Sequence, residues 1–264
     1  MEPSDRPKTA FATRKGLFQF KVMPFGLCNA GATFERLMET VLAGLNWEIC
    51  LIYLDDIIVV SRTFEGMIAN LSKVLERLLS AGLKLKAKKC SLFRKSVEYL
   101  GHIISSEGVT TDPRKIEAIQ NMSAPVNVGD LRSFLGICSY YRKFVKDFAK
   151  IAKPLHRLTE KNNSFVWNDE CQESFEKLKH SLTSAPILAH PDFRKDFILD
   201  TDASNFAIGA VLSQMDDGQE RVVAYASKAL SKSERRYCVT RKELLAVVYF
   251  KNYFKHYLFG RKFT

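Results

Sequence analysis

Two adjacent aspartates, Asp55 and Asp56, stand in the middle of an otherwise apolar stretch that runs from Cys50 to Val60. The aliphatic residues on either side are typical of buried strands, so the acids would lie where two strands meet at a tight turn. A buried carboxylate is costly unless it is paired, hydrogen-bonded or bound to a metal, and this stretch contains no basic residue. The pair therefore suits a hard divalent cation, whereas a water-exposed acidic turn is the alternative interpretation.

The composition indicates a globular protein with an anionic partner. Of 264 residues, 46% are hydrophobic and 26% are charged, which is typical of a folded chain and not of a disordered one. The formal net charge of +11 favours nucleic acid as the partner over an anionic membrane surface. The cysteines form no CxxC pair, so neither a zinc site nor a disulfide framework is expected. Because the sequence shows no signal peptide and no apolar run of membrane-spanning length, we expect a soluble intracellular chain.

The segments around the two aspartates predict a sheet with helices on one face. Alternating residues over 8–22 predict a hairpin. Apolar residues recur with helical spacing over 34–45 and 64–78, and a further strand pair is expected over 97–104. In this order the elements build an α/β or α+β layer, with the acids at the open edge of its sheet.

Basic residues gather in two segments. The first segment, residues 84–95, contains six bases and, taken alone, is typical of a strand edge exposed to solvent. Asp112-Pro113 and Asn127 are helix start signals, and the second of these helices is expected over 128–148. The bases in and beyond its end are spaced three or four residues apart: Arg142, Lys146, Lys150, Lys153 and Arg157. Such a stripe on one helix face could follow a phosphate backbone, or it could simply be a solvated face.

The last third of the chain returns to strands. A helix expected at 169–182 is followed by Pro186 and Pro191, which are typical of a linker. Strands are expected around 197–199, 208–213 and 221–226. Thr240 opens a last helix whose mainly buried residues are expected to be Leu244, Val247, Val248, Phe254, Tyr257 and Leu258. Residues 262–264 look like the start of another strand.

Six groups of residues follow one another along the chain as a recognisable series. They are Val22-Met23-Pro24-Phe25-Gly26-Leu27-Cys28-Asn29-Ala30 with Ala32-Thr33-Phe34, Tyr53-Leu54-Asp55-Asp56, Gly82-Leu83-Lys84-Leu85 with Lys88-Lys89-Cys90, Tyr99-Leu100-Gly101-His102, Leu131-Arg132-Ser133-Phe134-Leu135-Gly136 with Tyr140-Tyr141-Arg142-Lys143-Phe144, and Thr201-Asp202-Ala203-Ser204. Together they closely resemble the reverse transcriptase of gypsy-type long-terminal-repeat retrotransposons. Each motif alone is of moderate specificity, but six in the family's order are very specific.

The resemblance implies a multidomain fold of the α+β or α/β class. Its parts are a reverse-transcriptase palm at 1–105, a mostly helical thumb at 106–165, a connection at 166–192 and a ribonuclease H-like domain at 193–264. The implied activities are RNA-directed DNA polymerisation and cleavage of RNA–DNA hybrid, both by two-metal phosphoryl transfer with Mg²⁺, or Mn²⁺, as cofactor. The implied partners are an RNA template, a DNA primer, their hybrid and dNTPs, with a protease and an integrase elsewhere in the Pol polyprotein and no membrane. The implied location is cytoplasmic, in virus-like particles, or nuclear.

The resemblance also assigns roles to residues of the first part of the chain. It makes Asp55 and Asp56 the palm carboxylates that bind magnesium, and it places Lys89 near the triphosphate as a general acid. The residues that it places against the nucleotide, template or primer are Phe25, Gly26, Tyr53, Leu54, Tyr99, Leu100, Gly101 and His102. The residues that it places along the nucleic-acid backbone are Lys88, Arg142, Lys146 and Lys150.

In the last domain the resemblance makes Asp202 and Glu243 catalytic metal ligands. Asp200 lies two residues earlier on the same strand face and is expected to be a neighbour of the site, not a ligand. For Glu243 an alternative stays open, because Thr240 and Glu243 have the spacing of a capping box at the start of a helix.

The family pattern is incomplete in this sequence. The family places one more aspartate on a strand before residues 8–22 and two more beyond residue 264, and Gly31 stands where proline is usual. We therefore expect both sites to lack ligands and the chain by itself to be inactive or nearly so. Two alternatives remain: a module that grips a nucleic-acid duplex without catalysis, and a remnant that misfolds.

Overall fold

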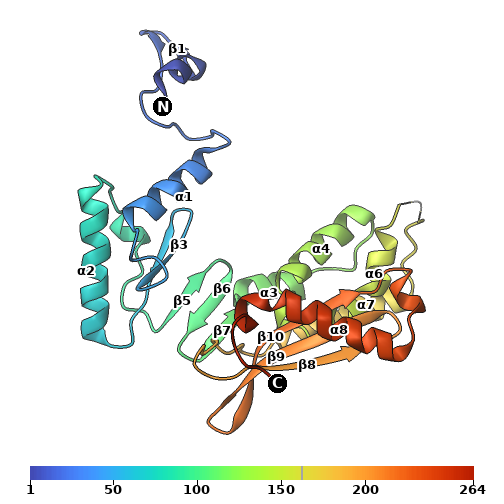
Figure 1. Ribbon diagram of the computed structural model, residues 1–264. Coiled ribbons are helices and arrows are strands. Elements are labelled where there is room, and N and C mark those ends of the chain that lie inside the picture. Colours follow the sequence, from blue (N-terminus) through green and yellow to red (C-terminus); the bar gives the residue numbers. More distant parts are fainter. Residues whose placement is uncertain (162) are drawn as a thin grey trace. The chain divides into compact units, whose positions relative to one another are not determined.

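The chain forms two compact units, residues 1–94 and residues 95–264, in a computed structural model that describes residues 1–161 and 163–264 (Figure 1). Each unit has its own hydrophobic cluster or clusters, and helices and strands alternate in both. Of the helices in the described part of the chain, none combines the length and the apolar character needed to cross a membrane.

Two hairpins and two helices make up most of the first unit. The hairpin expected within 8–22 and the acidic hairpin both form, and both are antiparallel. Residues 84–95 were expected to be a strand edge, but they hold only a short 3₁₀ helix. The elements in chain order are η1 (Pro3–Thr9), β1 (Phe11–Thr13), β2 (Gly16–Phe18), α1 (Ala30–Val41), β3 (Cys50–Tyr53), β4 (Asp56–Val59), α2 (Phe64–Ser80) and η2 (Ala87–Lys89).

Both helices of the first unit pack against the same face of the acidic hairpin. Ile52 of β3 lies opposite Ile57 of β4, and both side chains join the cluster formed by Met38 of α1 and Val74 of α2. Because side chains alternate along a strand, the neighbours of Ile52 and Ile57 in each strand point to the other face of the hairpin. The helices on one face of the acidic hairpin are thus as expected, but the strands expected in one layer form three separate sheets, β1-β2, β3-β4 and one that begins at residue 96. The cluster has few fully buried members: Met38, Leu42, Cys50, Val74 and Leu78.

The second unit begins with a three-stranded antiparallel sheet and continues with helices. Its first helices start where the sequence predicts, because Asp112 accepts a hydrogen bond from Arg114 N and Asn127 accepts one from Asp130 N. The elements are β5 (Ser96–Tyr99), β6 (His102–Ser105), β7 (Gly108–Thr111), α3 (Pro113–Gln120), α4 (Val128–Tyr140), η3 (Arg142–Phe144), α5 (Phe148–Ile151), α6 (Lys153–Leu158) and α7 (Asp169–Thr183).

The helix expected over 128–148 is wrong in its second half. Helix α4 ends at Tyr140, Val145 is extended, and Asp147 has a left-handed backbone with φ 56°. The basic stripe therefore does not lie on one helix face. The physical reason is burial. The chain leaves the helix so that Tyr141, Phe144 and Phe148 all enter the main cluster, the hydrophobic cluster that contains Phe134 and Phe175, and the free energy of burying these rings outweighs continuation of a regular helix.

A second three-stranded sheet closes the unit, in the order β10-β9-β8. Residues 262–264 begin to pair beside β8, since Phe263 forms a parallel bridge with Phe197. The elements are β8 (Ile198–Ala203), β9 (Ala207–Asp216), β10 (Gln219–Ala229), η4 (Glu234–Arg236), α8 (Val239–Tyr253) and α9 (Lys255–Leu258). The expected buried face of α8 was partly wrong. Leu244, Val247 and Val248 are exposed, and the helix instead buries Lys242, Ala246 and Phe250, followed by Phe254 and Leu258.

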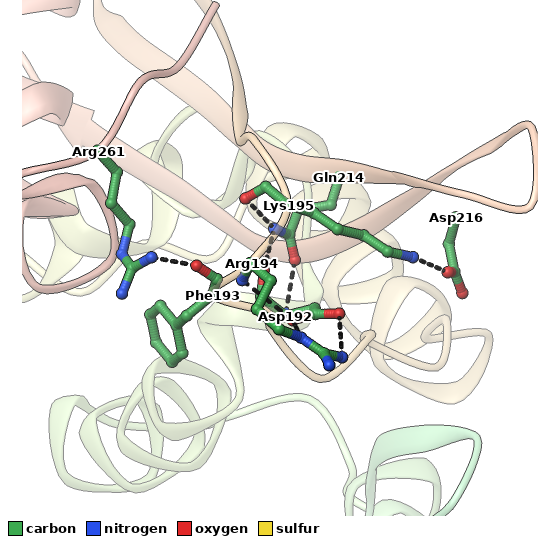
Figure 2. Close-up of polar contacts among 7 residues, drawn as sticks. All are labelled: Asp192, Phe193, Arg194, Lys195, Gln214, Asp216 and Arg261. Carbon is green, nitrogen blue, oxygen red and sulfur yellow. Dashed lines mark hydrogen bonds and ion pairs between the residues drawn. The ribbon is translucent and has the colours of Figure 1, made fainter.

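One glutamine fixes the loop that leads into β8. Figure 2 shows the side chain of Gln214, which is buried in β9, reaching this loop. Its Nε2 donates to Asp192 O at 2.9 Å and to Lys195 O at 3.2 Å, and its Oε1 accepts from Asp192 N at 2.9 Å. An ion pair between Lys195 and Asp216 and a hydrogen bond from Arg261 to Phe193 O hold the loop further. The first residues of β8, and with them the register of the strand, are thereby set.

Candidate functional site

The turn of the acidic hairpin is strained. Tyr53 lies opposite Asp56, so Leu54 and Asp55 are the two residues of the turn. Leu54 has φ 54°, a left-handed conformation that costs an L-residue about 1–2 kcal/mol. Strain of this kind persists where the surrounding structure imposes it, and it is concentrated at functional sites. Packing of the hairpin face against α1 and α2 supplies that surrounding structure.

Both aspartates of this turn have exposed side chains. Neither carboxylate makes a hydrogen bond or an ion pair with any residue that the structure describes, which decides against a carboxylate used for folding. The alternative of a water-exposed acidic turn agrees with this exposure as well as a cation site does. In contrast, the carboxyls of Asp112 and Asp192 each bind an arginine, and Arg194 lowers the pKa of Asp192 far below its ordinary value.

The other site residues of the first unit surround this turn only in part. A Cβ added at Gly31, on the first turn of α1, would lie 3.9 Å from Leu54 Cδ2, so this helix starts beside the acidic turn. The distance is an ordinary contact, so a β-carbon, such as that of the proline usual in the family, has room at this position. Phe25 is fully exposed, and Gly26 has φ 86° in the preceding loop. Lys88 and Lys89 are exposed in η2 and bond to neither aspartate in the described part of the chain.

The predicted residues Tyr99 to His102 lie in the second unit, at the turn between β5 and β6. Leu100 and Gly101 form this two-residue turn, with Tyr99 opposite His102. Tyr140 and Tyr141, which belong to the recognised series of residues but had no role assigned to them, bond to the turn. Arg142, Lys146 and Lys150, which were predicted to contact the nucleic-acid backbone, follow in the irregular segment after α4.

Asp202 lies on β8, opposite Gly209 of β9, and its side chain is exposed. It lines a small hollow together with residues of α5, β9, β10 and the adjoining loops: Asp147, Lys150, Ser204, Ala207, Ile208, Gly209 and Ser227. Ala149 N donates to Ser227 Oγ at 2.8 Å, so the segment at α5 is bonded to β10 beside this hollow. Asp200 is exposed on the same strand face as Asp202.

Glu243 lies in the first turn of α8 and is half-buried, but it does not line that hollow. The helix begins at Val239, and its cap residue Cys238 makes no side-chain capping bond. Thr240 is thus already inside the helix, and the capping-box alternative for Glu243 is wrong. The neighbouring Lys242 is buried and donates from Nζ to Asn205 Oδ1 at 3.0 Å. Nothing in the local sequence signals this buried lysine.

Neither set of acids forms a complete metal cage from this chain. Among residues 1–161 and 163–264, no group of three or more His, Cys, Asp or Glu side chains is arranged to hold a metal ion. The structure brings these acids together only in pairs within its described part: Asp55 with Asp56 at the hairpin, and Asp202 with Asp147 at the hollow. What a pair of exposed carboxylates can do is share a hard cation with ligands from elsewhere, such as substrate phosphates.

Comparisons with known proteins identify families for both ends of the chain. Residues 1–104 match the family described as reverse transcriptase (RNA-dependent DNA polymerase). Residues 167–264 match the RNase H-like domain found in reverse transcriptase. Two Drosophila melanogaster relatives are the retrovirus-related Pol polyproteins from transposons opus and gypsy, which are 42% and 38% identical, each over 98% of this chain. The chain spans about a quarter of their length, 27% and 26%.

Solved structures agree with these families. The foamy viral protease–reverse transcriptase dRH in complex with double-stranded DNA has a TM-score of 0.89 and 25% identity, covering 100% of this chain and 46% of that one. The foamy viral protease–reverse transcriptase in complex with RNA/DNA hybrid has a TM-score of 0.80 and 26% identity, covering 97% of this chain and 34% of that one. The predicted family and the mixed α and β fold class are both confirmed.

Proposed function

Since this chain belongs to the reverse transcriptase and RNase H-like region of retrotransposon Pol polyproteins, we propose that it takes part in copying RNA into DNA and in cutting RNA–DNA hybrid. The observation that carries this proposal is the strained turn with Asp55 and Asp56, two carboxylates left without a protein partner. The proposed partners are an RNA template, a DNA primer, their hybrid and dNTPs, and, as separate parts of the polyprotein, a protease and an integrase.

The proposed division of the chain is a palm at 1–105, a thumb at 106–165, a connection at 166–192 and a ribonuclease H-like domain at 193–264. The range 1–104, matched by the reverse transcriptase family, supports the end of the palm, whereas the RNase H-like match at 167–264 takes in the proposed connection as well. The compact second unit begins earlier, at residue 95, because the turn between β5 and β6 is hydrogen-bonded to α4. The last strands of the palm would then belong physically with the thumb.

Magnesium fits the acidic turn. Mg²⁺ is usually held by one or two carboxylates together with waters and substrate phosphates, and not by an all-protein cage. Asp55 and Asp56 are adjacent, exposed and unpaired, which matches that donor set. When bound, the metal would activate the attacking oxygen and neutralise charge on the phosphoryl group. Asp202 on β8 and Glu243 on α8 are the proposed ligands of the second metal site, and Mn²⁺ could replace Mg²⁺ in both sites.

The remaining residues of the palm would bind and orient the substrates. Tyr53 and Leu54 adjoin the carboxylates and would contact the primer end, while Phe25 and Gly26 would contact the nucleotide and template. Lys89 would donate a proton to the leaving pyrophosphate. Lys88, Arg142, Lys146 and Lys150 are not on one helix face, so they would contact the backbone of the duplex as separate bases and not as a stripe.

By itself, the 264-residue chain is proposed to bind a primer–template but to extend it hardly at all. Two-metal phosphoryl transfer needs several carboxylates that converge from separate elements. In the described part of the chain, Asp55 and Asp56 receive no third acidic, histidine or cysteine partner. Chemistry would require a further ligand from another segment or chain.

The test is one incubation of the purified chain with a labelled RNA template, a DNA primer, dNTPs and Mg²⁺ or Mn²⁺. It is read for duplex binding, primer extension and RNA cleavage, beside Asp55→Asn and Asp202→Asn variants. Asp217→Asn is the matched control, because Asp217 is also a hairpin-turn aspartate and is not near Asp202 in the hollow. In parallel, Mn²⁺ should broaden the amide NMR signals of residues 54–57 in the chain, and broaden them much less in Asp55→Asn.

We expect a salt-sensitive shift of the duplex in all four proteins, with little or no extension or cleavage. Extension that disappears in Asp55→Asn would confirm the polymerase assignment and refute the expected inactivity. Binding without any Mn²⁺ broadening at 54–57 would favour a module that only grips nucleic acid. Absence of both binding and broadening would overturn the proposed function.

A further inference from the structure

The turn between β5 and β6 has an unfavourable backbone. Leu100 and Gly101 have φ 48° and 66°, so both residues of this two-residue turn are left-handed. Such turns favour Asn-Gly or Asp-Gly, because a side chain at the first position clashes with the backbone unless it is small and polar. Leucine at this position does not specify the turn on its own. Other contacts must hold it.

Two tyrosines from the end of α4 supply those contacts. Tyr140 Oη donates to Leu100 O, and Tyr141 Oη donates to Gly101 O at 2.7 Å, across 40 residues of sequence. The two carbonyls of the turn are thus both occupied by hydroxyls from one helix end. A Cβ added at Gly101 would be in ordinary contact with the tyrosines, 3.4 Å from Tyr141 Oη and 3.5 Å from Tyr140 Cε1, so it is the left-handed backbone that favours glycine here and not a lack of space.

His102 adds a third bond and fills the space between the rings. Its Nδ1 lies 2.7 Å from Leu100 O, and since a carbonyl only accepts, Nδ1 carries the proton. The imidazole packs against three rings, those of Tyr140, Tyr141 and Phe144, at centroid distances of 5.4, 5.5 and 5.7 Å. Its Nε2 is buried and has no hydrogen-bond partner in the described part of the chain.

The two tyrosines differ in burial, and this difference distinguishes the contribution of a ring to the core from the role of a hydroxyl in holding the turn. Tyr141 is 2% exposed and belongs to the main cluster, so its ring stabilises the fold. Tyr140 is 53% exposed, so its ring contributes less to the core. Its clearest contact is the hydroxyl bond to Leu100 O, a bond made to the turn and not to the helices. Leu100 itself is 36% exposed, which leaves the outer surface of the turn open to a partner.

We propose that Tyr140 and Tyr141 are positioning residues that hold the Leu100–Gly101 turn against α4, so that turn and helix present one fixed surface to the primer strand of a bound duplex. This rests on the proposed function, because it assumes a primer–template as the partner. The bonds themselves do not depend on that assumption. The role acts through the turn, and the tyrosines need not touch nucleic acid.

The test compares the chain with a Tyr140→Phe/Tyr141→Phe variant, which keeps both rings and removes both hydroxyls. Tyr253→Phe is the matched control, since Tyr253 is 40% exposed on α8 and its hydroxyl has no hydrogen bond among the described residues. In the first arm, deuterium exchange of the free protein is measured over residues 99–104. We expect exchange there to become about tenfold faster in the double variant and unchanged in the control.

In the second arm, 2-aminopurine is the 3′-terminal base of the primer, and its fluorescence is read at saturating protein. The chain and Tyr253→Phe should give the same signal, whereas the double variant should bind within about twofold of the same affinity but give a different signal. A residue that only stabilised the fold would change affinity or folding and not the signal of the fully bound primer. If the double variant fails to fold, Tyr140→Phe alone, whose ring is exposed, replaces it.

Unchanged exchange over 99–104 would overturn the proposal, and so would an unchanged primer signal at saturation. If the unmodified chain binds no duplex, the proposed function fails and the primer-strand role fails with it. Faster exchange in the double variant would then show that the tyrosines hold the turn for fold alone. The two failures are therefore distinguishable.

Discussion

Residues 1–94 and residues 95–264 use their acidic side chains in different ways. In the first unit, Asp5 forms an exposed ion pair with Lys8, but the carboxylates of Asp55 and Asp56 are exposed and bind no residue that the structure describes, on a hairpin supported by a small cluster of buried side chains. In the second unit, Asp112, Asp192 and Glu234 each bind a basic side chain, and two larger clusters support the fold. Asp202 belongs to the second unit but resembles the acids of the first, because it too has no ion-pair partner among the described residues.

This difference separates carboxylates that stabilise the fold from carboxylates that remain available. An acid that binds an arginine or lysine has a lowered pKa and contributes to folding. An acid without a partner contributes little to folding, but it can bind a cation without first breaking an ion pair. The unit that contains the acidic turn also has the smaller core, so we expect mutations in the two units to differ in the size of their effect on stability.

The largest effect is expected from Phe134→Ala in the second unit. Phe134 is 1% exposed, and its ring centroid lies 4.6 Å from that of Phe175. Loss of a buried ring and the cavity it leaves should lower the free energy of unfolding by about 3–5 kcal/mol. Trp167 reports on this cluster because it packs edge-on against Phe175, so urea unfolding is followed by its fluorescence in a Trp47→Phe background. An unchanged midpoint would show that this cluster does not carry the stability of the unit.

A smaller loss is expected from Leu42→Ala in the first unit. Leu42 is fully buried, but several of its neighbours in the cluster are only partly buried, so the site can collapse around a smaller side chain. We expect a loss of about 2–3 kcal/mol, near the low end for such substitutions. Deuterium exchange of β3 and β4 measures it, while Trp167 fluorescence should stay unchanged. A simultaneous shift of both signals would mean that the two units unfold together and would break the comparison.

The sequence predicts best those features that neighbouring residues decide. The acidic hairpin and the helix starts after Asp112 and Asn127 depend on residues within a few positions of one another. Asp55 and Asp56 were found for the same reason. Their surroundings contain no basic residue, and this is visible without a structure.

The features that the sequence could not predict depend on distant contacts. The bases after Tyr140 keep helical spacing, but burial of Phe144 and Phe148 breaks the helix. In α8, the spacing of Leu244 and Val247 is equally compatible with a buried face, yet the sheet packs on the face that contains Ala246. The hydrogen bonds from Tyr140 and Tyr141 join residues that lie 40 positions apart in the sequence, and no local pattern predicts them.

The two functions of Asp112 can be separated by a pair of variants. Its side chain is 1% exposed, caps α3 through Arg114 N and forms an ion pair with the Arg114 guanidinium. Asp112→Ala removes both interactions and should cost about 2 kcal/mol of the second unit's unfolding free energy. Asp112→Asn keeps the cap and should cost about 1 kcal/mol. Equal losses in thermal unfolding of the two variants would assign the whole effect to the charge.

The smallest effect, and the most direct test of the two kinds of acid, is the response to low pH. Lys228 and the Ser231 amide lower the pKa of Glu234 from 4.5 to about 2, and Arg114 lowers the pKa of Asp112. The charged forms are favoured in the folded state, so their contribution is complete above the unfolded pKa and is lost as pH falls through the folded one. Unfolding of the second unit, followed by Trp167 fluorescence, should therefore become easier as pH falls from about 4.5 towards 2.

Glu234→Gln should reduce this pH dependence by about 1 kcal/mol, because its ion pair is partly exposed to solvent. The matched variant Asp55→Asn in the first unit should leave the free energy of unfolding at neutral pH unchanged, since Asp55 has no partner that its charge could stabilise among the described residues. If Asp55→Asn destabilised residues 1–94 at neutral pH as strongly as Glu234→Gln destabilises residues 95–264, Asp55 would be a structural acid. The division between stabilising and available carboxylates would then fail at the residue on which the proposed polymerase site depends.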